Sequence, residues 1–222
     1  MSFLRKQESR PLLFLWISAK LVLVKTGKHA GMTKKWTGVH GIFTKKIMYE
    51  EYWKLKEKPF ENTPDPRFLY LSSQHEEGFS RLLYVIKENK GAGMLTGLFG
   101  CGKTLLGRAL LTELPKDLYK IAFITNPRLS DIDLLRMIVF QLGKEEPLSG
   151  KTNILVALEK LLKDNFRDGR KTLVIIDEAH SIEDPNIFEE IRLLLNFQMN
   201  DKFLLTLLLF GQPELKEKVE YS

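Results

Sequence analysis

The chain has 222 residues, of which 44% are hydrophobic and 28% charged, an ordinary composition for one globular domain. Its single cysteine, Cys101, excludes a disulfide framework and a cysteine-based metal cluster. The net charge of +6 comes from residues 1–47, which hold ten Lys and Arg and one acidic residue. Residues 48–222 hold the remaining 24 of the 34 basic and 27 of the 28 acidic residues, so their net charge is −3. The overall basicity therefore does not predict nucleic-acid binding by this part of the chain.

The N-terminal piece, residues 1–47, differs in character from the rest. Its apolar run at 11–24 resembles the core of a signal peptide, but Lys20 interrupts it and no cleavage pattern follows. The run is also shorter than the roughly 20 residues that a membrane span needs. Three interpretations remain: a disordered basic arm, a weak membrane-surface segment, or residues that do not belong to the native protein. We favour the last, with Met48 as the true start, because the composition changes abruptly there.

After Met48 the pattern predicts one core domain, residues 48–222, of the α/β class. Three prolines in 55–72 predict an extended lead-in. Apolar spacing predicts helices at 72–91, 103–114, 130–143, 152–169 and 185–199, and strands at 93–97, 119–126, 171–180 and 202–215 with its exit turn. Strands alternating with helices predict a mostly parallel sheet covered on both faces, with ligands at the carboxyl ends of the strands.

The segment Gly97–Thr104, GLFGCGKT, has the spacing of a phosphate-binding loop and lies between a predicted strand and a predicted helix. In such a loop backbone N–H groups wrap the phosphates, Lys103 reaches the β- and γ-phosphates, and the Thr104 hydroxyl binds Mg²⁺. Cys101 is interpreted as a tolerated small residue that contributes its backbone N–H. The predicted nucleotide-binding residues are Gly97, Leu98, Phe99, Gly100, Cys101, Gly102, Lys103, Thr104 and Leu105.

Two acidic residues, Asp177 and Glu178, end the buried strand at 171–180. At this place Asp177 is predicted to bind Mg²⁺ together with Thr104, and Glu178 to polarise the attacking water as a general base. The tetrapeptide Asp-Glu-Ala-His also names a helicase group. Because the other helicase motifs and a second motor domain are missing, His180 is interpreted as a loop residue rather than as a coupling element.

Polar residues follow two further strands. Asn126 either restrains Glu178 until a partner binds or simply forms an Asn-Pro turn, and the sequence leaves both interpretations open. Gln212 is predicted to sense the γ-phosphate or orient water, with a plain turn as the alternative. Arg192, on the helix after Glu178, is interpreted as a member of a surface or inter-subunit ion pair rather than as a phosphate sensor.

Several of these segments, in order, resemble the AAA+ ATPases of the general (type II) secretion pathway protein A group, called ExeA-like. They are the Pro-Phe…Pro-Asp-Pro lead-in, the Walker A loop at 97–104, ITNPRLS, the Walker B strand LVIIDEAH, IRLLLNF and LLLFGQPEL, so the resemblance covers 48–219. It implies a P-loop NTPase fold, ATP and Mg²⁺ as cofactors, Asn126 as the switch of the catalytic Glu178, and Gln212 as the first sensor. It also implies a homo-oligomer at full length, in the cytoplasm or at the inner face of the cytoplasmic membrane.

The resemblance sets the expected function and its alternatives. We expect an ATP-hydrolysing protein that energises assembly of a secretion or pilus apparatus, with membrane proteins of that apparatus as partners. The alternatives are a DNA-transposition helper that binds DNA, and a nucleotide-gated interaction module with little turnover.

The chain departs from the family pattern at Lys54, at Gly78-Phe79, at Cys101 and at its end. The family core continues past Gly-Gln-Pro-Glu-Leu with an arginine finger, a fifth strand and a helical lid. We therefore expect a truncated core with weak turnover. Since the family's strand order is 5-1-4-3-2, we also expect the strand before the phosphate loop to be an exposed sheet edge.

Overall fold

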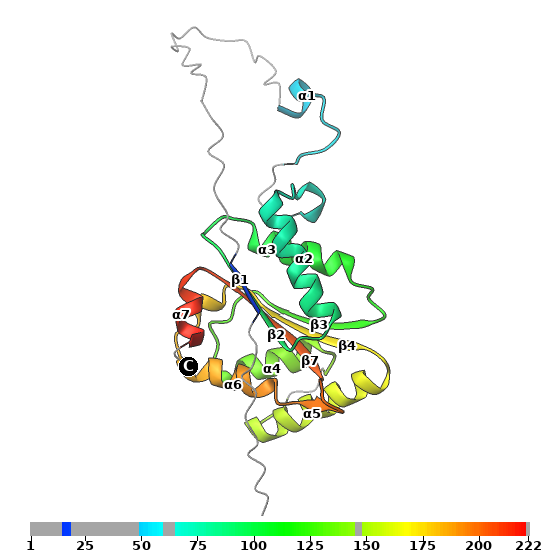
Figure 1. Cartoon of the computed structure of the whole chain (residues 1–222), viewed down its shortest axis with the longest axis vertical. Helices are drawn as coiled ribbons and strands as arrows, with labels where there is room; N and C mark the ends of the chain where they lie inside the picture. The colour runs from blue at the N-terminus through cyan, green and yellow to red at the C-terminus, as the bar shows by residue number, and fades with distance from the viewer. Residues whose placement is uncertain (1–14, 19–48, 60–64, 145–147, 221–222) are drawn as a thin grey trace, which may run out of the picture.

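The computed structural model describes residues 15–18, 49–59, 65–144 and 148–220, and within them a five-stranded sheet is covered by helices on both faces (Figure 1). All neighbouring strands in this sheet are parallel, which confirms the predicted α/β class. In spatial order the strands are β1 (Leu15–Ser18), β2 (Ala92–Thr96), β7 (Leu205–Gly211), β4 (Lys171–Ile176) and β3 (Tyr119–Ile124).

The helices form two layers, one on each face of the sheet (Figure 1). One layer contains α2 (Ser73–Lys87) and α3 (Lys103–Glu113); the other contains α4 (Asp131–Gln141), α5 (Lys151–Arg167) and α6 (Pro185–Leu194). Shorter elements are α1 (Tyr49–Trp53), α7 (Glu214–Glu220) and the 3₁₀ turns η1 (Pro66–Phe68) and η2 (Ala179–Ser181). Each helix and strand expected after Met48 is present, with shifts of a few residues at the ends.

The central strand β7 is buried along its whole length. Leu207 and Leu209 contribute to the core beneath α4, α5 and α6, while Leu208 and Phe210 contribute to the core beneath α2 and α3. This alternation is what a strand covered on both faces requires, and it explains the continuous apolar run in the sequence.

A small antiparallel hairpin was not expected from the sequence. The helix predicted at 185–199 ends at Leu194, and β5 (Gln198–Met199) then pairs with β6 (Lys202–Phe203). The turn residues Asn200 and Asp201 have φ of 52° and 60°, the left-handed conformation that tight hairpin turns need. The Asn-Asp pair was therefore the available signal for this turn.

The edge beside β2 is not open in the structure. Leu15–Ser18 pairs in parallel with Gly93–Thr96, so main-chain hydrogen bonds of β2 are used on that side. The expectation of an exposed edge is thus not what the structure shows for these residues. The proposed start at Met48 and the rest of the 1–47 piece lie outside the described residues.

Helix α3 lies very close to β7 because Gly107 has no side chain. A Cβ built at Gly107 would lie 2.6 Å from Cε2 of the buried Phe210 ring. Gly78, in the middle of α2, differs: its Cβ would meet the nearest atoms, of Leu106 and Leu95, at 3.8 Å. The two buried helical glycines therefore differ in the space around them: Gly107 has no room for a methyl group, whereas Gly78 has enough.

We predict that Gly107→Ala lowers the free energy of unfolding by about 1–3 kcal/mol, because the added methyl group overpacks against Phe210. The matched control Gly78→Ala should leave stability unchanged or raise it by about 0.5–1 kcal/mol, since alanine favours helix and the space is adequate. Urea unfolding followed by circular dichroism measures both. Equal effects of the two substitutions would contradict the packing argument.

One lysine links the three helices α4, α5 and α6, which cover the same face of the sheet. Lys151 Nζ lies 3.0 Å from Asp131 Oδ2 on α4 and 2.7 Å from Glu190 Oε1 on α6. Glu190 and then Asp131 raise the pKa of Lys151, and Lys151 lowers the pKa of Asp131. Because all three side chains are partly exposed, the network contributes modestly to stability.

We predict that Lys151→Met lowers the free energy of unfolding at pH 7 by less than about 1 kcal/mol. The pKa of Asp131 is depressed in the folded state, so its contribution is present above the unfolded pKa of about 3.9 and is lost as pH falls through the folded value. The difference between wild type and variant, measured by urea unfolding, should therefore shrink between pH 5 and pH 3. A difference that stays constant over this range would contradict the assignment.

Candidate functional site

The carboxyl ends of four adjacent strands bring the predicted site residues to one edge of the sheet. The register pairs Thr96 of β2 with Gly211 of β7, and Ile176 of β4 with Ile124 of β3. Gly97 N–H donates to the Gly211 carbonyl at 3.1 Å, which ties the start of the phosphate loop to the end of β7. The loop, the acidic pair after β4 and the polar residue after β7 therefore come together as predicted.

The loop is shaped by glycines in the left-handed region. Gly100 has φ of 74° and Gly102, the N-cap residue just before α3, has φ of 83°. No side chain caps the first turn of α3, so its N–H groups and the positive end of the helix face the loop. The outer loop residues Leu98 and Phe99 are exposed.

Lys103 is folded back into the loop. Its side chain is buried, and Nζ donates to the carbonyls of Gly97 at 2.9 Å and Leu98 at 3.0 Å. Nζ also lies 3.8 Å from the sulfur of Cys101. A buried ammonium held by loop carbonyls is a strong electrostatic feature for an anionic ligand.

His75, which the sequence did not single out as a site residue, supports the loop from α2. Its Nδ1 lies 2.7 Å from Ser72 Oγ, and its Nε2 lies 3.2 Å from the carbonyl oxygen of Cys101. Ser72 also caps α2. The signal in the sequence was the Ser-Ser-Gln-His start of the helix, but the distance of 26 residues to the loop concealed the contact.

Thr104 and Asp177 meet across 73 residues of sequence. Thr104 Oγ1 donates to Asp177 Oδ2 at 2.5 Å, and Asp177 Oδ1 accepts from the Glu178 N–H at 2.9 Å. Asp177 is 2% exposed, so its carboxylate is fixed by these partners. A hydroxyl and a carboxylate oxygen side by side fit a hard divalent cation that takes its remaining ligands from phosphate and water.

Glu178 has a different environment. Its side chain is 41% exposed and its φ of 52° lies in the left-handed region, which is unusual for a residue other than glycine. This conformation turns the chain sharply after β4 and into η2. Backbone strain of this kind costs on the order of 1 kcal/mol and clusters at functional sites.

The two further polar residues lie at the same edge with different partners. Gln212 Nε2 is 2.8 Å from His180 Nε2, so the turn after β7 contacts the turn after β4. The Asn126 side chain is exposed and its Oδ1 accepts from the Arg128 N–H at 3.4 Å, the local contact expected of an Asn-Pro turn. Among the described residues no hydrogen bond joins Asn126 to Glu178, so the switch role stays a prediction.

Arg192 forms an ion pair on its own helix. Its Nη2 lies 2.6 Å from Glu189 Oε2, and both side chains are substantially exposed. This geometry favours the surface ion pair over a phosphate sensor.

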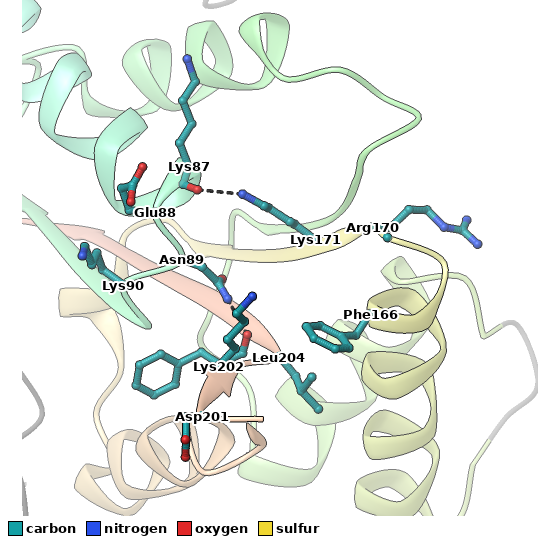
Figure 2. A pocket seen from close by; sticks show the side chains of 12 residues that line it. Lys87, Glu88, Asn89, Lys90, Phe166, Arg170, Lys171, Asp201, Lys202 and Leu204 are labelled. Atoms are coloured by element: carbon teal, nitrogen blue, oxygen red, sulfur yellow. Dashed lines mark hydrogen bonds between the residues drawn. The ribbon is translucent and has the colours of Figure 1, made fainter. Parts of the chain in front are cut away.

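A cavity of about 500 Å³ lies at the opposite, amino end of the strands (Figure 2). It is rich in cations, and two of them are engaged locally: Lys171 Nζ donates to the Lys87 carbonyl at the end of α2 at 2.7 Å, and Arg170 pairs with Asp168. Figure 2 shows the Arg170 and Lys87 side chains extending away from the centre of the view. The first contact caps the end of α2, the second is a side-chain ion pair, and they do not converge on a ligand, so the carboxyl edge is the better candidate site.

The fold and this edge define the class of protein. A parallel sheet with a glycine loop leading into a helix, a buried Asp beside the loop threonine, and a polar turn on the neighbouring strand are the parts of a P-loop NTPase. A family model described as an AAA domain matches residues 86–219. The chain belongs to this AAA family, and the ExeA-like resemblance is confirmed.

One protein to which the chain is similar is the General secretion pathway protein A of Aeromonas hydrophila. It is 38% identical over 172 residues, which are 77% of this chain and 31% of the relative. The chain thus spans about a third of that protein's length.

Solved structures show the same fold at lower identity. The Aeropyrum pernix ORC2 protein, solved with ADPNP and ADP, has a TM-score of 0.54 at 20% identity and covers 73% of this chain and 47% of its own. The Aeropyrum pernix ORC1 protein in complex with DNA has a TM-score of 0.53 at 19% identity, and the match covers 68% of this chain and 42% of that protein. Cdc6p of Pyrobaculum aerophilum has a TM-score of 0.51 at 22% identity, and the match covers 68% of this chain and 45% of that protein. Within the described ranges, no helix combines the length and apolarity that crossing a membrane demands.

Cys101 offers a direct probe of the loop, because it is the only cysteine and is partly exposed. We predict that bound nucleotide slows its alkylation by iodoacetamide by about tenfold or more, since phosphates cover the loop backbone. Mass spectrometry of the alkylated fraction over time measures the rate. In Lys103→Ala the protection should disappear, and protection that persists there would contradict nucleotide binding in the loop.

Proposed function

We propose that this chain binds ATP with Mg²⁺ and hydrolyses it, and that hydrolysis energises assembly of a cell-envelope secretion or pilus apparatus. The observation that carries the hydrolytic part is the contact between Thr104 and the buried Asp177, next to Lys103 in the loop and to the exposed Glu178. The role in the cell envelope rests on the likeness to General secretion pathway protein A.

Each site residue then has a distinct task. The loop N–H groups and Lys103 would bind the phosphates, and Thr104 Oγ1 and Asp177 Oδ2 would hold Mg²⁺. When bound, the cation neutralises charge on the phosphate oxygens. Asp177 is buried and immobilised, whereas the Glu178 carboxylate is exposed and can take the proton of an attacking water as a general base.

Substitutions of Lys103 and Glu178 should separate binding from hydrolysis. We predict that Lys103→Ala weakens binding of a fluorescent ATP analogue by at least about tenfold, because it removes the charge-assisted hydrogen bonds to phosphate. Glu178→Gln should keep the affinity and lower turnover by about 10²–10⁴-fold, because the amide cannot accept the proton. Fluorescence titration measures the first effect and single-turnover phosphate release the second.

Exposed residues outside the proposed site provide the controls. Lys160→Ala on α5 removes a lysine far from the loop, and Glu183→Gln changes a carboxylate five residues after Glu178. Both should behave as wild type. Normal ATP binding by Lys103→Ala, or normal turnover by Glu178→Gln, would refute the proposed site.

The cellular role needs a second measurement. Turnover with and without duplex DNA distinguishes the secretion role from the transposition alternative, because a DNA-dependent helper should be stimulated. We propose a cytoplasmic location, at or near the inner face of the membrane where ATP is available, and assembly into homo-oligomers. Strong stimulation by DNA would overturn the secretion assignment but leave the ATPase site intact.

A further inference from the structure

The His180 ring lies between the two residues that the proposed reaction needs after the phosphate loop. Its Nε2 is 2.8 Å from Gln212 Nε2 and 3.5 Å from Glu178 Oε2. The histidine therefore connects the turn after β4 with the turn after β7. The sequence indicated only a loop residue and predicted no function for this histidine.

The position of His180 is fixed by its backbone. Its carbonyl accepts from Lys218 Nζ on α7 at 2.6 Å, and the same ammonium donates to the Ile182 carbonyl at 2.6 Å. A Cβ at Gly211 would lie 3.2 Å from His180 N, so η2 can approach β7 because that residue is glycine. The ring is 17% exposed and cannot easily turn away.

The two ring nitrogens are unequal. Nδ1 is buried and has no hydrogen-bond partner among the described residues, whereas Nε2 has two polar neighbours. In a neutral imidazole, Nε2 carries either one proton or one lone pair, so it makes one strong hydrogen bond. The Gln212 amide donates to an unprotonated Nε2, whereas the Glu178 carboxylate can only accept from a protonated Nε2, so the two hydrogen bonds exclude each other.

We propose that His180 is a positioning residue that couples the general base Glu178 to the sensor Gln212. In the described arrangement Nε2 lies closer to Gln212. When the Gln212 amide turns toward a nucleotide phosphate, Nε2 loses this donor, and proton exchange with water moves the imidazole proton from Nδ1 to Nε2. The protonated Nε2 then donates to the Glu178 carboxylate and orients it toward the attacking water. This inference rests on the proposed hydrolytic function and adds a communication step within the same site.

Kinetics of substituted chains test the coupling. His180→Phe keeps the ring shape and removes both nitrogens, and it should lower kcat by about tenfold to a hundredfold while KM changes less than about twofold. His180→Gln returns a polar group near the place of Nε2 and should recover part of kcat. Asn186→Ala, an exposed change at the start of α6, should behave as wild type.

A double-mutant cycle shows whether His180 acts through Gln212. His180→Phe and Gln212→Ala combined should lower kcat no further than the more severe single substitution, because both break one link. Independent, multiplicative effects would overturn the proposal, as would an unchanged kcat in His180→Phe. If Glu178→Gln hydrolyses ATP normally, it is the proposed function that fails.

A readout without turnover protects the test against folding defects. The chain has four histidines, so the ¹⁵N signals of the imidazoles are assignable by substitution. A non-hydrolysable ATP analogue should shift the Nε2 signal of His180 in the wild-type chain, and Gln212→Ala should remove most of this shift while still binding the analogue. An unchanged Nε2 signal, or an equal shift in Gln212→Ala, would overturn the coupling.

Discussion

The two-sided pairing of β7 is the constraint on which the rest of the structure depends. This strand is buried on both faces and hydrogen-bonds in parallel to β2 and β4, so its register fixes the height at which each neighbouring strand ends. The loop after β2, the acids after β4 and Gln212 after β7 consequently reach the same level. A shift of one residue in this register would reverse every core-facing side chain of the strand.

Close backbone approach supplies the second constraint. Gly107 lets α3 lie against the Phe210 ring, and Gly211 lets η2 lie against the end of β7. The first glycine places the helix that begins at the phosphate loop, and the second places His180. Small residues at these two positions thus control distances inside the site even though they contribute no functional group.

The general architecture and the main site were predictable because their signals are local. The buried runs, the helical spacing and the loop at 97–104 each depend on residues adjacent in the chain. The sequence did not predict the hairpin at 198–203 because two-residue strands leave almost no periodic pattern. The contacts of the two histidines were not predicted for another reason, which is their distance along the chain. His75 contacts Cys101 across 26 residues, and His180 contacts Gln212 across 32 residues.

By itself the sequence determined the class of fold, the phosphate loop and the acidic pair, because glycine spacing, apolar periodicity and strand-end charges are written along the chain. Only the tertiary structure decided which of these side chains are buried, which are exposed and which contact one another. It buried Asp177 against Thr104, left the Glu178 side chain exposed, and set one histidine nitrogen between Glu178 and Gln212. Those assignments depend on strand register and on glycine-permitted approach, which are properties of packing and not of local composition.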